Sequence, residues 1–194
     1  MQTKEFIEML KKRHSYYDLV PGEKPDAKAL EELLGEIAEA TPDSFNMQAG
    51  KMVLLLNEDS TAFWDKVNHT FEEKLSPAKL AGFKNAVGTV LFFTDNGIVN
   101  RIAEKFPLYA ENFPIFASHA MGMLQINTWT ALRLAGYGAS LQHYNPVIDP
   151  WVHADYEIPE DWALIAQMPF GHIGSEAPNK PKVPRSERVK VWHK

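Results

Sequence analysis

One long apolar segment constrains the fold of this chain more than any other feature of the sequence. Residues 118–134, SHAMGMLQINTWTALRL, are apolar on nearly every helical face, and Gly136 follows as a typical residue at a helix C-terminus. A helix with so little polar surface has to bury most of its sides against other elements. We therefore expect 118–134 to be a deeply buried helix, with a subunit interface as one place for it.

Shorter segments around this helix indicate the class of fold. Helical spacing of Leu and Ile predicts a helix over 26–40 with Asp26 as its N-cap, and Pro42 ends it. Four short runs have the β-branched, aromatic or alternating character of strands, namely 51–57, 88–94, 162–171 and 188–193. The links between the later strands are too irregular for crossover helices. This favours an α+β sandwich with a mixed, mainly antiparallel sheet over a doubly wound fold.

Composition limits the number of domains and the kinds of partner. A chain of 194 residues with 45% apolar content can bury one substantial core, so we expect a single domain, 1–194, with a Pro-rich C-terminal arm from about residue 175. A net charge of −5 disfavours a nucleic-acid surface. No apolar run reaches the roughly 20 residues of a spanning helix, and the N-terminus lacks the apolar centre of a signal peptide. We expect a soluble, cytoplasmic protein that binds neither nucleic acid nor membrane.

The residue types present also limit the chemistry. Without cysteine there is no thiol nucleophile and no cysteine-ligated metal or cluster, so any redox chemistry needs a bound cofactor. The histidines are candidate metal ligands, but no pair has the i, i+4 spacing with a neighbouring Glu of a metalloprotease helix. A metal-dependent hydrolase is therefore disfavoured, and we expect no metal site.

Two basic segments lie near the ends of the chain. Arg13, His14 and Ser15 follow an amphipathic N-terminal helix, and an Arg fork beside a Ser hydroxyl offers the donors that a phosphate or a carbonyl edge requires. A basic helix C-terminus that complements the macrodipole is the alternative, and this segment alone favours it. Lys182 and Arg185 lie in the Pro-stiffened arm, where basic side chains can clamp a dianion, although a solvated basic tail would look the same.

Two uncharged segments complete the set of candidates. Ser44, Asn46 and Gln48 recur at every second position, so an extended backbone would direct all three the same way. A capped turn is the alternative, but a turn rarely needs three such side chains. The small residues that begin 138–144 would let backbone N–H groups approach a flat ligand, unless the segment is a plain buried strand. Phosphate anchors, ribityl partners and donors around a ring edge are together what one bound FMN requires.

At this point the chain resembles the nitroreductase family of FMN-dependent flavoproteins, and within it the subgroup of fungal fatty-acid-repression proteins and bacterial copper-induced nitroreductases. The resemblance is carried by the motifs at 13–15 and 42–48, by GTVLFF at 88–93, and most specifically by 122–149 and 158–171. It implies a three-layer α+β sandwich in which two intertwined subunits form a homodimer. Each of two FMN molecules would lie at the interface and touch both chains.

The same resemblance implies which residues contact FMN. From one subunit they are Arg13, His14, Ser15, Tyr17, Lys84, Ser140, Leu141, Gln142, Lys182 and Arg185, and the other subunit supplies Ser44, Asn46 and Gln48. The residues of 13–15 and of the arm would bind the phosphate and ribityl end. Lys84 would neighbour the pyrimidine edge, and the backbone of 140–142 would face the ring near its reactive nitrogen. Tyr17 stands where the wider family usually has a basic residue.

The activity implied by the resemblance is that of an NAD(P)H-dependent flavin oxidoreductase. NADH or NADPH would reduce the flavin and leave, and a nitroaromatic, a quinone or a similar small-molecule acceptor would be reduced in the second half of a ping-pong cycle. The flavin carries the chemistry, so no side chain is assigned a catalytic role. A sensor on the same fold that binds flavin or a fatty-acyl compound without turnover stays open as the alternative.

Overall fold

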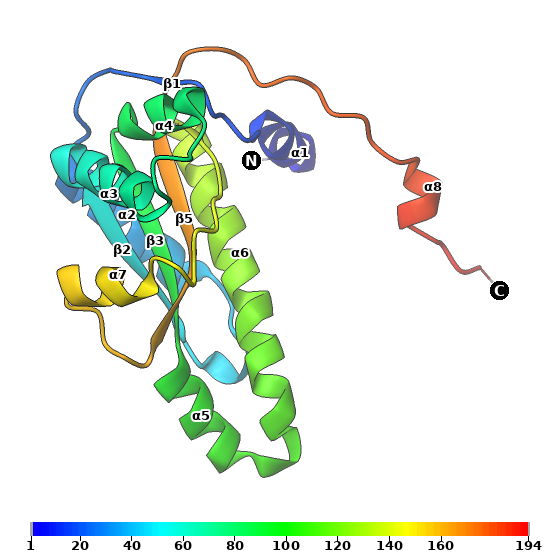
Figure 1. Cartoon of the computed structure of the whole chain (residues 1–194). Helices are drawn as coiled ribbons and strands as arrows, with labels where there is room; N and C mark the ends of the chain where they lie inside the picture. The colour runs from blue at the N-terminus through cyan, green and yellow to red at the C-terminus, as the bar shows by residue number, and fades with distance from the viewer. Residues whose placement is uncertain (1, 194) are drawn as a thin grey trace.

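An antiparallel sheet forms the centre of the fold (Figure 1). The computed structural model describes residues 2–193, so Met1 and Lys194, the ends of the expected single domain, lie outside it. The sheet has the order β1-β5-β3-β2, and β4 pairs with β5 off this path. Its strands are β1 (Leu19–Val20), β2 (Gly50–Leu56), β3 (Gly88–Asp95), β4 (Gly138–Ala139) and β5 (Trp162–Ile173). The pairings between these strands are all antiparallel, which confirms the kind of sheet expected from the sequence.

Helices cover both faces of the sheet. On one face pack α2 (Ala27–Ala40) and α6 (Phe113–Leu134), and on the other pack α3 (Asn57–Thr70), α4 (Pro77–Lys84) and α7 (Asp149–Asp155). The remaining helical elements are α1 (Thr3–Lys12), η1 (Ser44–Asn46), α5 (Asn96–Lys105), η2 (Pro107–Asn112) and α8 (Arg185–Arg188). The arrangement is the three-layer α+β sandwich that the resemblance implies.

β3 joins the two helical layers because its side chains alternate between the faces of the sheet. Val90 and Phe92 pack in the cluster that contains α2 and α6, whereas Leu91 packs in the cluster of α3, α4 and α7, and all three are fully buried. Thr89 accepts a hydrogen bond from the Trp64 indole N–H at 2.8 Å, so a polar contact also ties α3 to the strand. Burial on both faces explains the continuous apolar run in the sequence.

Most of the elements expected from the sequence are confirmed. The helix over 26–40 forms behind Asp26, whose carboxylate accepts from the N–H groups of Lys28 and Ala29 at 3.0 and 3.2 Å. These bonds satisfy two of the donors that a helix start leaves free. Three of the four expected strands form within two residues of their expected bounds, and they are β2, β3 and β5.

The fourth expected strand, 188–193, does not form. α8 ends at Arg188, and residues 189–193 have no regular structure. Figure 1 shows the arm leaving the body of the protein, and Trp192 is 91% exposed. The expectation was wrong because alternation alone does not make a strand: a neighbouring strand has to supply the backbone hydrogen bonds, and this chain places none beside the arm.

α6 begins at Phe113, earlier than expected, and is buried on one face only. The opposite face carries an exposed apolar stripe, called the α6 stripe below, which consists of Ile115, Met123, Ile126 and Leu134. These four side chains are between 37% and 61% exposed, so the expectation of deep burial is wrong for this half of the helix within one chain. Between residues 2 and 193, no helix has the length and apolarity that a bilayer crossing demands.

Replacing Leu91 by Ala should lower the free energy of unfolding by about 2–5 kcal/mol, because Leu91 is fully buried and its truncation leaves a cavity beside α3. The matched control is Leu108→Ala. Leu108 is 84% exposed, so its truncation should change the free energy of unfolding by less than about 0.5 kcal/mol. Urea unfolding followed by circular dichroism measures both, and equal effects would contradict the core described above.

Candidate functional site

The residue after α1 is held against α6 by an aromatic ring. Arg13 follows the last residue of α1, and its guanidinium carbon lies 4.3 Å from the centroid of the Trp129 ring. The side chain is partly buried, and this burial lowers the pKa of the Arg13 guanidinium from its usual value. His14 makes an edge contact with the Tyr16 ring, with 6.3 Å between ring centroids. Arg13 therefore has a defined place near the C-terminal end of α6.

The chain continues from Arg13 alongside β4. Ser15 forms a parallel bridge with Ala139, and the Tyr16 N–H donates to the Ala139 carbonyl at 2.9 Å. Tyr17 follows, exposed beside α4. A Cβ at Gly82 of α4 would lie 2.0 Å from the Tyr17 carbonyl oxygen, so the close approach requires glycine. The backbone thereby places the basic N-terminal segment next to β4.

Just beyond β4, one backbone N–H has no backbone acceptor among residues 2–193. Ser140 and Gln142 are buried and donate their N–H groups to the Pro169 and Gln167 carbonyls of β5, at 3.3 and 2.7 Å. Leu141 lies between them, and its N–H is directed to the other side because successive N–H groups alternate along an extended chain. In the described part of the chain, no backbone hydrogen bond uses that N–H as donor. The Leu141 N–H is therefore able to bind the edge of a planar ligand.

A buried glutamine that the sequence patterns did not single out fixes this segment. Gln167 is fully buried in β5, its side-chain oxygen accepts from the Tyr144 N–H at 2.9 Å, and its backbone exchanges two hydrogen bonds with Gln142. Gln142 in turn donates from its side-chain amide to the Ser140 hydroxyl at 3.0 Å. The available signal was one amide inside an apolar strand, because a buried amide has to find partners.

Lys84 forms an ion pair of its own. Its ammonium pairs with the Asp65 carboxylate at 2.7 Å, and it lines a separate hollow together with Lys24. The lysine of α4 near Tyr17 is instead Lys79, whose Nζ is 5.6 Å from the centroid of the Tyr17 ring. The structure thus places the segment 13–17 beside β4, which leads directly into 140–142, and it pairs the Lys84 ammonium with Asp65.

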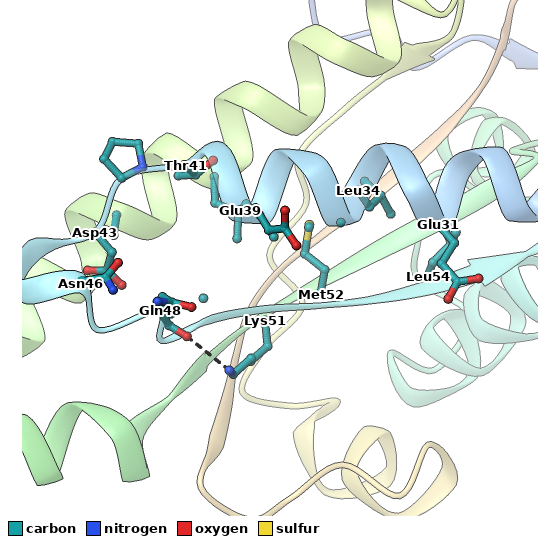
Figure 2. Close-up of a pocket in the computed structure, with 16 residues that line it drawn as sticks. Glu31, Leu34, Glu39, Thr41, Asp43, Asn46, Gln48, Lys51, Met52 and Leu54 are labelled. Carbon is teal, nitrogen blue, oxygen red and sulfur yellow. Dashed lines mark hydrogen bonds between the residues drawn. The ribbon is translucent and has the colours of Figure 1, made fainter.

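The run from Asp43 to Gln48 is a tight turn rather than an extended strand. η1 occupies its centre, and Phe45, Asn46 and Gln48 have φ values of 56°, 52° and 55°, in the left-handed region that residues other than glycine rarely adopt. The expectation that an extended backbone directs Ser44, Asn46 and Gln48 the same way is therefore wrong. Asn46 and Gln48 nevertheless line one cavity of about 600 Å³ between α2 and β2, shown in Figure 2.

The Asp43 carboxylate organises this turn, and the sequence patterns gave it no role. One of its oxygens accepts from the Ala49 N–H at 3.2 Å. Burial raises the pKa of Asp43 even though hydrogen bonding from the backbone lowers it. The other oxygen is buried and has no hydrogen-bond partner among the described residues.

One chain does not bring the two groups of candidate residues together. Phe45 of the turn packs against Phe113 at the start of α6, with 5.0 Å between ring centroids, whereas Arg13 packs on Trp129 near its end. A rise of about 1.5 Å per residue separates these two places by on the order of 24 Å along the helix. The arm, with Lys182 and Arg185, is exposed and leaves the body (Figure 1). A site that uses both groups needs a second chain.

The fold is a three-layer α+β sandwich that carries Arg13 and the Leu141 N–H on neighbouring segments. This combination suits an oxidoreductase that works through a bound flavin. The sequence profile of the Nitroreductase family matches residues 10–172. The chain belongs to the nitroreductase family. Membership of this family confirms that the chain is a flavin oxidoreductase, as expected from the sequence. It also confirms the expected cofactor, FMN, and the expected co-substrate, a reduced nicotinamide.

Individual relatives support the same assignment over nearly the whole chain. Nitroreductase FRM2 of Saccharomyces cerevisiae is 34% identical over 175 residues, which cover 87% of this chain and 88% of FRM2. Among solved structures, nitroreductase CinD from Lactococcus lactis in complex with chloramphenicol has a TM-score of 0.90 and 37% identity, and the match covers 97% of this chain and 100% of CinD. A nitroreductase structure from S. cerevisiae has a TM-score of 0.74 and 30% identity, with 88% and 97% covered.

Asp43→Ala should lower the free energy of unfolding by about 1–3 kcal/mol, because the Ala49 N–H loses its acceptor. Asp43→Asn should cost less at pH 7. It keeps an acceptor oxygen and removes a charge that the raised pKa shows to be unfavourable in the folded state. Urea unfolding of both variants at pH 7 tests this order, and a larger loss for Asp43→Asn would mean that the charge, not the hydrogen bonding, holds the turn.

Proposed function

We propose that this chain is an FMN-dependent oxidoreductase that takes reducing equivalents from NADH or NADPH and passes them to small-molecule acceptors such as nitroaromatics and quinones. The observation that carries the proposal is the position of Arg13 and of the Leu141 N–H on two segments that pair through Ser15 and Ala139. Two neighbouring segments thereby carry a cation, Arg13, that can bind a phosphate and a donor, the Leu141 N–H, that can bind a ring edge. FMN requires both. CinD in complex with 4-nitrophenol supports a nitroaromatic as one acceptor.

The residues around this point fit FMN in charge and in hydrogen bonding. Arg13 forms no ion pair with a carboxylate in the described chain, so its donors remain for an anion. Arg13, with Ser15 beside it, would hold the phosphate, and the Leu141 N–H would donate at the ring edge near the reactive nitrogen. Bound FMN would supply hydride transfer, first from the reduced nicotinamide and then, in a separate step, to the acceptor. A preorganised N–H donor stabilises the negative charge that develops at the ring edge.

Three surfaces that lack a partner in the single chain support a homodimer. The α6 stripe is apolar and exposed. β2 is an edge strand, so the backbone groups of Gly50–Leu56 that face away from β3 have no strand to pair with. In the arm, Val189 and Val191 alternate with other residues as in a strand. A second copy would cover the stripe, and its segment 188–193 would pair with the open edge of β2.

The cavity beside β2 has the chemistry to receive the arm of a second copy. Its floor includes the apolar side chains of Leu34 and Met52, and α2 contributes the carboxylates of Glu31 and Glu39 (Figure 2). The residues 188–193 carry basic side chains among apolar ones, so the charges are complementary. In such a dimer, Ser44, Asn46 and Gln48 of one chain would complete the FMN site built on Arg13 of the other.

Location and other partners stay predictions from the sequence. A cytoplasmic location fits the absence of cysteine, which is compatible with a reducing compartment. A net charge of −5 fits a protein that does not bind nucleic acid. Among the remaining FMN contacts implied by the resemblance, Lys182 and Arg185 would close on the phosphate, which requires the arm to fold back from the position shown in Figure 1.

The purified protein should be yellow, or become yellow with added FMN, and NADH or NADPH should bleach the flavin absorbance under anaerobic conditions. A nitroaromatic or a quinone should then restore the absorbance, because the reduced flavin passes its electrons to the acceptor. Flavin that binds but is reduced by neither nicotinamide would identify a sensor on this fold instead of an enzyme. A protein that stays colourless in excess FMN would overturn the proposal.

Ile126→Asp should convert the dimer into a monomer, because a carboxylate in the middle of the α6 stripe would be left unpaired in an apolar interface. Light scattering at matched protein concentration measures the change in mass. Val147→Asp is the control: Val147 is 53% exposed and lies beside α7, on the opposite face of the sheet, so this variant should stay dimeric. A monomeric unchanged protein, or a dimer that survives Ile126→Asp, would contradict the interface.

A further inference from the structure

We propose that Trp129 is a positioning residue: its indole face holds the Arg13 guanidinium ready for the FMN phosphate, and so sets the preference of the protein for FMN over riboflavin. The inference rests on the proposed function, since it assumes that the protein binds a flavin. It goes beyond that function because it assigns a role to a side chain of α6 that does not itself contact the phosphate.

The contact between the two side chains is close. The guanidinium carbon of Arg13 lies 4.3 Å from the centroid of the Trp129 ring, the shortest cation–ring distance in the described chain, where the others range up to 5.9 Å. Separations below about 6 Å over the face of Trp are attractive, and guanidinium groups stack well on such faces. Stacking uses the face of the guanidinium and leaves the N–H donors along its edge for an anion.

The ring itself is anchored. Trp129 is partly buried and packs against the core cluster formed by α2, α6 and the sheet. One turn further along α6, Arg133 donates from Nε to the Lys12 carbonyl at 3.3 Å, and its guanidinium lies 5.6 Å from the centroid of the Tyr16 ring. The Tyr16 hydroxyl donates to the same Lys12 carbonyl at 3.3 Å. α6 therefore holds the chain on both sides of Arg13, and Trp129 holds the side chain between them.

A fixed guanidinium discriminates between two ligands that share a ring system. An Arg side chain free to rotate loses conformational entropy when it binds a phosphate, whereas one already stacked on an anchored ring loses less. FMN carries a phosphate and riboflavin does not, so the benefit falls on FMN alone. Partial burial, which lowers the pKa of Arg13, also favours FMN over riboflavin. The guanidinium has already lost part of its hydration, so it loses less when it binds a phosphate.

The experiment compares the affinities of the full-length protein, stripped of bound flavin, for FMN and for riboflavin by quenching of flavin fluorescence. Trp129→Leu should weaken FMN about 3- to 30-fold and riboflavin less than about twofold. Trp129→Phe keeps a ring and most of the packing, so it should fall between the unchanged protein and Trp129→Leu. In an Arg13→Ala background, which itself weakens FMN far more than riboflavin, Trp129→Leu should have no further effect on the ratio of the two affinities.

The control is Trp151→Leu, which removes a comparable stack, with the Lys66 ammonium 4.8 Å from the ring centroid, on the opposite side of the sheet. Its ratio of FMN to riboflavin affinity should equal that of the unchanged protein. If Trp129→Leu and Trp129→Phe weaken both ligands equally, Trp129 only supports the fold and the inference is overturned, while the flavin function stands. If the unchanged protein binds neither ligand, the proposed function fails and the inference fails with it.

Discussion

The structure depends on α6 packing with two surfaces at once. One face of this helix closes the core over β3 and β5, and the other leaves the α6 stripe uncovered. A helix with apolar residues on both sides gains stability when both sides are buried, which is the basis for the dimer proposed above. The candidate site follows from the same helix, because the turn at Asp43 packs near its start and Arg13 near its end. The length of α6 keeps the two groups apart within one chain, and for this reason the proposed FMN site draws on two chains.

The parts of the fold that could be predicted from the sequence are those with local signals. The Asp26 cap and the spacing of leucines behind it define α2 within a few residues. The apolar run of β3 was interpreted correctly because burial on both faces removes the polar residues from a strand. Arg13 and the segment 140–142 were singled out by residue type alone, and the bridge between Ser15 and Ala139 brings them together.

The parts that could not be predicted depend on backbone conformation or on distant neighbours. The residue types of this run do not indicate the left-handed φ at Phe45, so the spacing of its polar residues predicts an extended segment where the structure has a turn. Lys79 and Lys84 lie on one short helix, and only the position of Asp65 shows that Lys84 is paired elsewhere. The role of Asp43 follows from the hydrogen bond that its carboxylate accepts from the Ala49 N–H across the turn, which the sequence does not reveal.

The open edge of β2 also has a consequence for how long the protein survives in a cell. An edge strand of apolar residues with unpaired backbone groups is a template on which other strands can add. The exposed, proline-containing linker before α8 is the kind of segment that proteases cut. In the proposed dimer the arm of a second copy would cover this edge, so a molecule that has lost its arm would leave the β2 edge of its partner open to strands from other molecules.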